Sequence, residues 1–318
     1  MTATAPRERC DTGLVHEAMP YRDDREFLEG TVGYVRAALA SGRPVLVELP
    51  AGRNELVRGA LGEDAPRVRF GDMAEHGRNP ARIIPAVLHD FAAAHRGSRA
   101  VVVAESLWAS RSAAEYEVCI EHEALVNLAF ADQELSILCP YNLTDLPVQA
   151  LADLGRTHPA LREGGTSRLS MGYTDPHTVL DTIAALQPET PADAERLDYG
   201  FVAEARHAVK EWCAHAGLPA ARLTDLLIAV SEVSGNSVAH AGAAESILFW
   251  QEAGSLVFEI RDGGHIRDLL AGRLPPPDEQ ESGRGLLMVN LLCDLVQIKT
   301  GPSGTAIRMW MALPATER

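Results

Sequence analysis

The stretch Ser231-Glu-Val-Ser-Gly-Asn-Ser-Val-Ala-His240 decides how the second half of this chain folds. Its polar residues Glu232, Asn236 and His240 recur every four positions, which places them on one face of an α-helix. The other face carries an apolar stripe at helical spacing, formed by Leu223, Leu226, Leu227, Val230 and Val233. The pattern therefore predicts a helix with a buried back that presents a carboxylate and a carboxamide one turn apart.

Two glycine motifs follow this helix. Asp262-Gly-Gly264 ends an apolar strand pattern, where the carboxylate could accept the amino hydrogens of adenine and the glycines let a base approach the backbone. Gly283-Arg-Gly285 opens a helix pattern, where free N–H groups favour phosphate and Arg284 could add a charged contact. Each motif alone is a weak signal, but their order predicts a nucleotide-binding site.

The helix supplies the groups that such a site needs for chemistry. The Asn236 carbonyl oxygen could bind Mg²⁺ without adding negative charge beside the phosphates of ATP. Glu232, one turn away, could orient or deprotonate an attacking hydroxyl group. ATP and Mg²⁺ are therefore the expected cofactors.

Composition excludes several other classes of protein. The chain has 318 residues, enough for two domains, and a net charge of −15 that argues against direct binding of nucleic acid. The apolar runs fall short of the roughly 20 residues of a membrane helix, and the N-terminus lacks a secretory signal pattern. The five cysteines form no C-x-x-C pair, so we expect a cytoplasmic protein without a disulfide framework.

The first half alternates helix and strand patterns, which predicts a parallel α/β sheet. The expected strands are Pro44–Leu49, Val68–Phe70, Arg99–Ala104 and Leu135–Cys139. The expected helices are Phe27–Ser41, Asn54–Leu61, Arg82–His95 and Ala113–Phe130. The second half reads as two helices followed by a mostly antiparallel sheet, an α+β sandwich. The boundaries we predict are 1–162 for a first domain, 163–194 for a proline-containing linker with a helical patch at Val179–Leu186, and 195–318 for a second domain.

The second domain resembles the Bergerat-fold ATPase domain shared by histidine kinases and DNA gyrase. More narrowly, Asp225–Ala241 resembles the anti-sigma-factor serine kinases of bacteria, as does the segment Arg206–Leu218 with its Trp212 and Gly217-Leu218. The resemblance implies that Glu232 is the catalytic base and that Asn236 is the Mg²⁺ ligand. It also implies that Asp262, Gly264 and Thr305 hold adenine, and that Gly283 and Gly285 hold the phosphates. The implied partners are a sigma factor and an anti-sigma-factor antagonist that carries the target serine.

The first domain resembles the MEDS sensory domain, a degenerate RecA-like module of bacterial regulators. The matching pieces are His16, Glu105-Ser-Leu-Trp108, Glu121-His-Glu-Ala-Leu-Val-Asn127, Cys139-Pro-Tyr-Asn142 and His158-Pro159. From these pieces, the residues expected to sense a small-molecule ligand are Glu105, Trp108, Glu121, Asn127, Cys139 and Tyr141. The alternative is a structural role, in which Glu121 and Asn127 form hydrogen bonds with buried backbone groups and Cys139 is an ordinary residue of the hydrophobic core.

Two absences limit the chemistry expected of the first domain. No Gly-Lys-Ser or Gly-Lys-Thr follows Leu49, so we expect no ATP hydrolysis there. The spacings of His16, Cys139 and His158 match no known metal-ligand pattern, so the sequence does not predict a metal site.

The leading hypothesis is a signalling regulator in which a sensor domain controls an ATP-dependent protein serine kinase. A sensor histidine kinase is the first alternative, although His177 and His207 do not lie in the long paired helices that such an enzyme needs. A non-catalytic ATP-binding module is the second alternative. Whether the chain forms a homodimer stays open.

Overall fold

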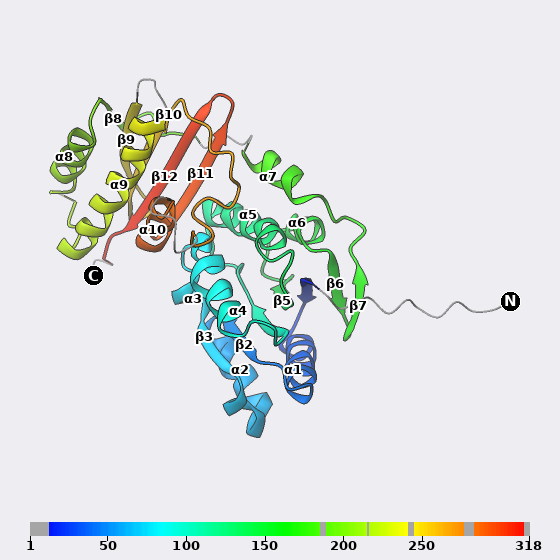
Figure 1. The fold of residues 1–318 in the computed structure, drawn as a ribbon. Helices are drawn as coiled ribbons and strands as arrows, with labels where there is room; N and C mark the ends of the chain where they lie inside the picture. The colour runs from blue at the N-terminus through cyan, green and yellow to red at the C-terminus, as the bar shows by residue number, and fades with distance from the viewer. Residues whose placement is uncertain (1–12, 185–188, 215, 241–244, 277–282, 315–318) are drawn as a thin grey trace.

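The computed structural model describes residues 13–184, 189–214, 216–240, 245–276 and 283–314. Leu186 and Pro188, which the sequence places in the linker region, lie outside the described residues. The described chain forms a seven-stranded sheet in its first half and a five-stranded sheet in its second half, called sheet A and sheet B here (Figure 1). The predicted fold class is confirmed, because sheet A is mostly parallel and sheet B is antiparallel with helices on one face.

Sheet A has the strand order β3-β2-β4-β5-β1-β6-β7, and only the β6–β7 pair is antiparallel. Its strands are β1 Val15–Tyr21, β2 Val45–Leu49, β3 Arg69–Asp72, β4 Ala100–Ala104, β5 Leu135–Asn142, β6 Ala160–Glu163 and β7 Thr166–Leu169. Leu46 and Val102 belong to the core on one face, whereas their neighbours Val47 and Val103 belong to the core on the other. Both faces of the sheet are therefore buried, which explains why the strands read as nearly continuous apolar runs.

Helices cover sheet A on its two faces. The first face packs against α1 Asp24–Ala40 and α2 Ala51–Leu61. The second packs against α4 Asp90–Ala94, α5 Ala113–Ala129, α6 Ala150–Thr157 and α7 Pro176–Ala184. The start of α5 is fixed by a capping box, in which the Ser112 hydroxyl accepts from the Glu115 N–H and the Glu115 carboxylate accepts from the Ser112 N–H.

Three parts of the first half differ from the sequence-based prediction. The prediction misses the central strand β1, whose interior His16 and Glu17 interrupt the apolar pattern expected of a buried strand. The expected helix over Arg82–His95 is irregular: a 3₁₀ turn at Pro80–Arg82 and a π-helical segment at Ile84–His89 precede α4. Pro85 lies in this segment and lacks the N–H that a regular helix would use. The region 163–194 contains β7, which pairs with β6, and α7, which packs on the sheet A core.

Sheet B has the strand order β11-β12-β10-β9-β8. Its strands are β8 Glu195–Tyr199, β9 Glu245–Glu252, β10 Ser255–Asp262, β11 Leu295–Gly301 and β12 Gly304–Ala312. Its helices are α8 Val202–Cys213, α9 Ala220–His240 and α10 Gly285–Leu292. The predicted apolar stripe is buried as expected: Leu226, Val230 and Val233 on α9 belong to the core between the helices and the sheet. The strand β8 precedes the helices and was not predicted.

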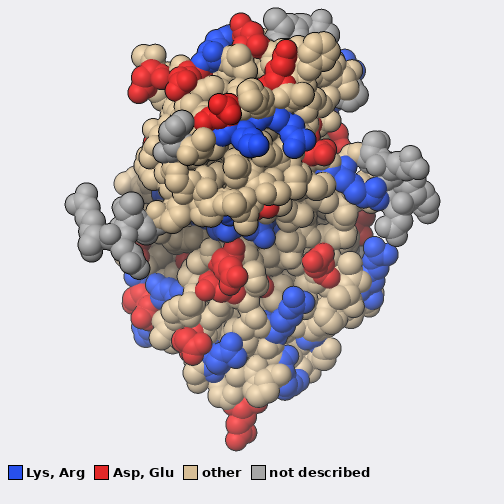
Figure 2. Space-filling model, turned by 90° about the vertical axis from the view of Figure 1, so that its left-hand side faces the viewer, with Lys and Arg blue, Asp and Glu red and all other residues tan. Residues whose placement is uncertain are grey.

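The other face of sheet B is covered by the first half of the chain. Val118 on α5 and Ala81 pack against Trp250, Val257 and Trp310 of this face. Helix α5 therefore contributes to the cores of both halves, and it lies where the two halves meet (Figure 1). On the face of the molecule in Figure 2, the Lys and Arg side chains are interspersed with Asp and Glu. None of the helices in the described ranges is long and apolar enough to cross a membrane.

Candidate functional site

A pocket of about 340 Å³ opens between α9 and the ends of β10 and β12. Its size suits a nucleotide-sized ligand. It brings together four predicted residues from three parts of the sequence, namely Asn236, the pair Asp262 and Gly264 of one glycine motif, and Thr305. The rest of the lining, which is mostly apolar, consists of Val233, Ser237, His265, Ile266, Leu286 and Ile307. The arrangement is a largely apolar slot with a few convergent polar groups.

The carboxylate of Asp262 is held from two sides. Ser237 donates its hydroxyl to Oδ2 at 2.5 Å, and the Gly264 N–H donates to Oδ1 at 2.7 Å. The Thr305 hydroxyl then donates to the Gly264 carbonyl at 2.9 Å. These bonds fix both the carboxylate and the glycine turn at this side of the pocket.

Glu232 and Asn236 meet the second glycine motif at the start of α10. A Cβ atom added to Gly285 would lie 2.7 Å from Glu232 Oε2 and 3.6 Å from Asn236 Nδ2. Within the described part of the chain, no hydrogen bond or ion pair engages the side chain of Glu232 or Asn236. Two polar groups one helical turn apart are thus left for a ligand, beside a helix N-terminus suited to phosphate.

The remaining predicted residues lie just before α10. Gly283 has a φ of 94°, a conformation that favours glycine, and both Gly283 and Arg284 are exposed. The residues immediately before them, 277–282, are outside the described ranges. Gly283, Arg284 and Gly285 do not line the pocket itself, although Gly285 borders the face of α9 that carries Glu232.

Sequence reasoning missed Ser237 and the apolar part of the lining. Ser237 continues the buried stripe of α9, since it follows Val233 by one turn. A hydroxyl on a buried stripe needs a hydrogen-bond partner, so this position offered a signal that could have been used. Ile266 and Leu286 lie next to glycine motifs but carry no distinguishing signal of their own.

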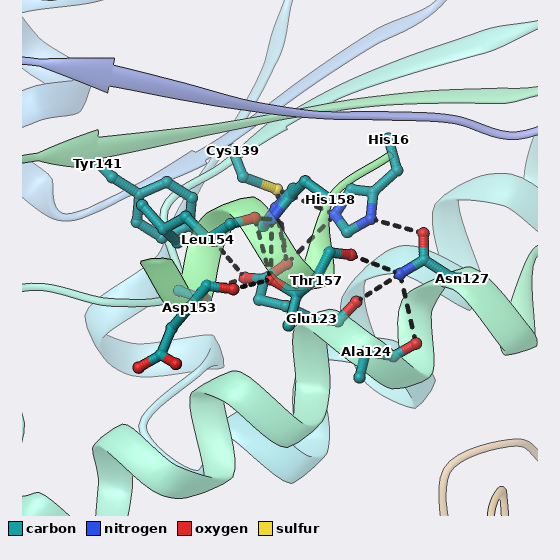
Figure 3. A network of polar contacts seen from close by, with 11 residues as sticks. His16, Glu123, Ala124, Asn127, Cys139, Tyr141, Asp153, Leu154, Thr157 and His158 are labelled. Carbon is teal, nitrogen blue, oxygen red and sulfur yellow. Dashed lines mark hydrogen bonds and ion pairs between the residues drawn. The ribbon is translucent and has the colours of Figure 1, made fainter. Parts of the chain in front are cut away.

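A second constellation of polar side chains is buried between sheet A and α5 (Figure 3). It consists of His16 on β1, Glu123 on α5, Cys139 on β5 and His158 at the end of α6. The parallel β1–β5 pairing sets Ala18 opposite Cys139, two residues along from His16 on the same face. Segments far apart in the sequence therefore converge on one helix.

Glu123 lies at the centre of this cluster. Its Oε1 accepts hydrogen bonds from the Tyr141 hydroxyl at 2.7 Å and from the Ser106 hydroxyl. Its Oε2 faces His16 Nε2 at 3.2 Å and His158 Nε2 at 3.4 Å. Burial raises the pKa of the Cys139 thiol and lowers the pKa of His158.

Three of the six sensing candidates belong to this cluster. Cys139 and Tyr141 contact Glu123, and Asn127 contacts His16. Glu123 itself was not among the candidates. The signal was available, because Glu123 and Asn127 have the same one-turn spacing on a helix as Glu232 and Asn236.

The other three candidates lie elsewhere. Glu105 is buried after β4 and accepts a hydrogen bond from the Tyr21 hydroxyl at 3.1 Å, and burial raises the pKa of Glu105 to about 7. Trp108 donates to Ser110 and lies under the Arg111 guanidinium. Glu121 points out of the first half and pairs with Arg273 at 2.6 Å.

Comparisons with known proteins match two separate parts of the chain. Residues 15–159 match the family model of MEDS, the methanogen/methylotroph, DcmR sensory domain. Residues 196–311 match the model of the histidine kinase-like ATPase domain. The chain therefore joins a MEDS domain to an ATPase domain of the histidine kinase-like class.

Two solved structures illustrate the similarity at a distance. The RsbU and RsbW domains of Rv1364c from Mycobacterium tuberculosis are 20% identical, with a TM-score of 0.30, and the match covers 40% of this chain and 34% of that one. The histidine kinase AdeS from Acinetobacter baumannii is 11% identical, with a TM-score of 0.24, and the match covers 48% of this chain and 88% of that one. The chain thus spans about a third of the length of the first of these structures. A search among curated proteins found no match.

Proposed function

We propose that this chain is an ATP-binding signalling regulator whose C-terminal domain phosphorylates a serine of a protein partner under the control of its MEDS domain. The observation that carries the proposal is the convergence of Glu232, Asn236 and Gly285 beside the pocket that holds Asp262. A carboxylate, a metal-binding carboxamide and a helix N-terminus are the groups that transfer of a phosphoryl group to a hydroxyl requires.

Each part of the pocket has a role in this reaction. Asp262, held by Ser237 and the Gly264 N–H, accepts a hydrogen bond from the amino group of adenine. The Asn236 carbonyl oxygen is the group that would hold Mg²⁺ on the phosphates, and Mg²⁺ would neutralise charge on the group being transferred. Glu232 lies one turn from Asn236, where a carboxylate can take the proton of the attacking serine hydroxyl.

Serine is preferred over histidine as the acceptor because the helix that precedes sheet B is short. A sensor histidine kinase needs two long helices that pair and carry the acceptor histidine. In the described part of the chain, the helix before sheet B is α7, which has nine residues and packs against the core of the MEDS domain. His177 is exposed on this short helix, and His207 is exposed on α8, within the ATPase domain.

The resemblance of Asp225–Ala241 to anti-sigma-factor kinases supports the choice of partners. We infer that the substrate is an anti-sigma-factor antagonist and that a sigma factor is the second partner. The net charge of −15 suits partners with basic surfaces.

Control by the MEDS domain would run through α5. Glu121 on this helix pairs with Arg273, and Glu117 accepts from Gln297 at 2.6 Å and from Lys299. Arg273 belongs to the segment that follows the Gly264 turn, so α5 is linked to one wall of the pocket.

In the MEDS domain, Pro50 is the single residue between β2 and α2, which leaves no phosphate-binding loop of the P-loop kind.

Transfer of labelled phosphate from ATP tests the proposal. The full chain is incubated with [γ-³²P]ATP, Mg²⁺ and a candidate antagonist protein, and the products are treated with acid. Acid-stable label on a serine of the antagonist is the expected result. Acid-labile label on the chain itself would indicate a histidine kinase, and ATP binding without any label would indicate a non-catalytic module.

A further inference from the structure

The cluster of His16, Glu123, Cys139 and His158 is sealed from solvent. The four residues are exposed by 2, 1, 3 and 0% respectively. Their ligating atoms all lie within 4.8 Å of one another. The ATP reaction proposed above does not use them.

Neighbouring groups determine where the imidazole protons lie. Asn127 Nδ2 donates to three backbone carbonyls, those of Glu123, Ala124 and Thr157, which fixes the orientation of the amide. Asn127 Oδ1 therefore faces His16, and the His16 Nδ1–H donates to it at 3.1 Å. The His158 Nδ1–H likewise donates to the Leu154 carbonyl at 3.0 Å.

Both imidazoles thus turn an Nε2 lone pair toward the centre of the cluster. Glu123 Oε2 adds a third acceptor, because the two hydroxyl donors occupy Oε1. Among the described residues, the Cys139 thiol is the single proton donor in reach of these acceptors, at 3.5 Å from His16 Nε2 and 3.8 Å from Glu123 Oε2. His158 Nε2 has no hydrogen-bond partner in the described part of the chain. Three buried acceptors that share one weak donor are costly unless a cation satisfies them.

We propose that these four side chains bind a divalent transition-metal ion, Zn²⁺ in the first instance, at a site formed by β1, α5, β5 and the end of α6. Two imidazoles, one carboxylate and one thiolate are a ligand set suited to Zn²⁺. In a tetrahedral site each ligand–ligand distance is about 1.6 times the bond length, hence about 3.3–3.8 Å. The distances of 3.2, 3.4, 3.5 and 3.8 Å between ligating atoms fall in or next to this range.

The site has the features of a closed metal centre. Four protein ligands complete the coordination, and the burial of all four leaves no open position for a water molecule. Asn127 and the Leu154 carbonyl orient the two imidazoles from behind, as outer partners of metal-bound histidines do. Metal bound here would therefore stabilise or signal from the MEDS domain and would not catalyse a reaction.

Cobalt titration of the full chain tests the site, because Co²⁺ bound to thiolate gives a charge-transfer band in the near ultraviolet. The metal content of the purified chain is measured first by mass spectrometry. The chain is then stripped with a chelator and titrated with Co²⁺, followed by displacement with Zn²⁺. We expect one metal ion per chain and a thiolate band that Zn²⁺ abolishes.

Two variants and a matched control complete the design. Cys139→Ser should lose the thiolate band and weaken Co²⁺ binding by about 100-fold or more, and Asn127→Ala should weaken it by roughly 10- to 100-fold. Cys293→Ser, which changes a buried cysteine of the ATPase domain, should behave as the wild type. Circular dichroism checks the fold of each protein. The proposal is overturned if the folded wild type binds no stoichiometric metal, or binds it without a thiolate band. It is also overturned if folded Cys139→Ser binds Co²⁺ as tightly as Cys293→Ser.

Discussion

Two carboxylate–carboxamide pairs with the same one-turn spacing lie at the two sites of this molecule. On α9, Glu232 and Asn236 have no protein partner within the described residues and border a pocket. On α5, Glu123 and Asn127 are buried, and each of them is engaged by several groups. The spacing places two polar groups on one face of a helix, and the packing around that face decides whether a ligand or the protein satisfies them.

The proposed role of Asn236 as a Mg²⁺ ligand leads to the first prediction. Asn236→Ala should weaken ATP binding by roughly 10-fold or more in the presence of Mg²⁺ and have little effect when Mg²⁺ is chelated, because a charge-assisted contact of this kind is worth about 1.5–3 kcal/mol. Calorimetry of the full chain measures both conditions. The control is Gln251→Ala, an exposed carboxamide on β9. Equal affinities for the variant and the wild type with Mg²⁺ present would rule out the ligand role.

The proposed role of Glu232 as the catalytic base leads to the second prediction. Glu232→Gln keeps the shape of the side chain but removes a carboxylate that can accept a proton. Phosphorylation of the antagonist serine should fall by roughly 10²–10⁴-fold while ATP binding persists. Glu211→Gln, an exposed position on α8, is the matched control in the labelling assay. A parallel loss of ATP binding would mean that Glu232 only holds the helix and the glycine motif together.

The buried carboxyl of Glu105 predicts a dependence of stability on pH. Burial raises the pKa of Glu105 from 4.5 to about 7 in the folded chain. The protonated form is therefore favoured by folding, and its contribution is complete below the unfolded pKa and is lost as the pH rises through about 7. The loss is about 3 kcal/mol in total, given about 1.4 kcal/mol for each pKa unit.

Glu105→Gln should remove this dependence, because glutamine still accepts the Tyr21 hydrogen bond but does not ionise. The free energy of unfolding is measured with a denaturant for both proteins. The value for the variant minus the value for the wild type should rise by about 2–3 kcal/mol between pH about 5 and pH about 8. Glu63→Gln, an exposed site, should show no such change. A difference that is flat with pH would mean that the Glu105 carboxyl is not protonated by burial.

At the scale of elements, the β11–β12 hairpin packs against Asp262 at one side of the pocket. Gly304 has a φ of 129°, and a Cβ there would lie 2.5 Å from the Asp262 carbonyl oxygen. Gly304→Ala should therefore cost about 1–3 kcal/mol of stability and shift Asp262. Gly301, in the same hairpin, has open space around its Cα, so Gly301→Ala is the control and should be nearly neutral. Thermal unfolding and ATP affinity are measured for both variants, and only Gly304→Ala should be impaired. Equal values for the two variants would mean that the hairpin relaxes around the added methyl group.

Elements with a strong apolar period could be predicted from the sequence. The stripe on α9 and the runs of β2 and β4 gave correct types and places, because their burial is carried by local residues. Strand β1 was missed, since His16 and Glu17 are buried by partners that lie over a hundred residues away. Strand β8 was missed because its residues are mostly exposed at the edge of the sheet.

The sites show the same limit, because contacts between residues far apart in the sequence leave no local pattern. The motifs that carry Asn236 and Asp262 lie close together in the sequence, so they could be predicted to share one pocket. The cluster around Glu123 joins four elements, and its members have no regular spacing because the sheet topology, and not a loop, brings them together. Tertiary packing alone determined that Glu123 lies between His16 and His158.

For the molecule as a whole, α5 is shared by both halves. Toward sheet A it presents Glu123, toward sheet B it presents Val118 and Glu117, and toward the segment after β10 it presents Glu121. The partners Lys299 and Arg273 are 3% and 2% exposed, so their charges depend on these glutamates for compensation. Removing one member of a buried ion pair typically costs about 3–5 kcal/mol. The two domains are therefore expected to be energetically coupled through this helix.

The coupling leads to the last prediction, for the double variant Glu117→Gln and Glu121→Gln. In the wild type, the two domains should unfold in one calorimetric transition, and Mg-ATP should raise its midpoint, because a ligand of one domain stabilises all that unfolds with it. In the variant, two buried cations lose their partners, so the transition should split in two. Mg-ATP should then raise the midpoint of the ATPase domain alone.

The control for the change in net charge is the double variant Glu55→Gln and Glu63→Gln, at two exposed sites in the MEDS domain. If the variant still unfolds in one transition that shifts as a whole with Mg-ATP, the apolar contacts of Val118 and Ala81 with Trp250 and Trp310 suffice to couple the domains, and the ion pairs on α5 do not carry the signal.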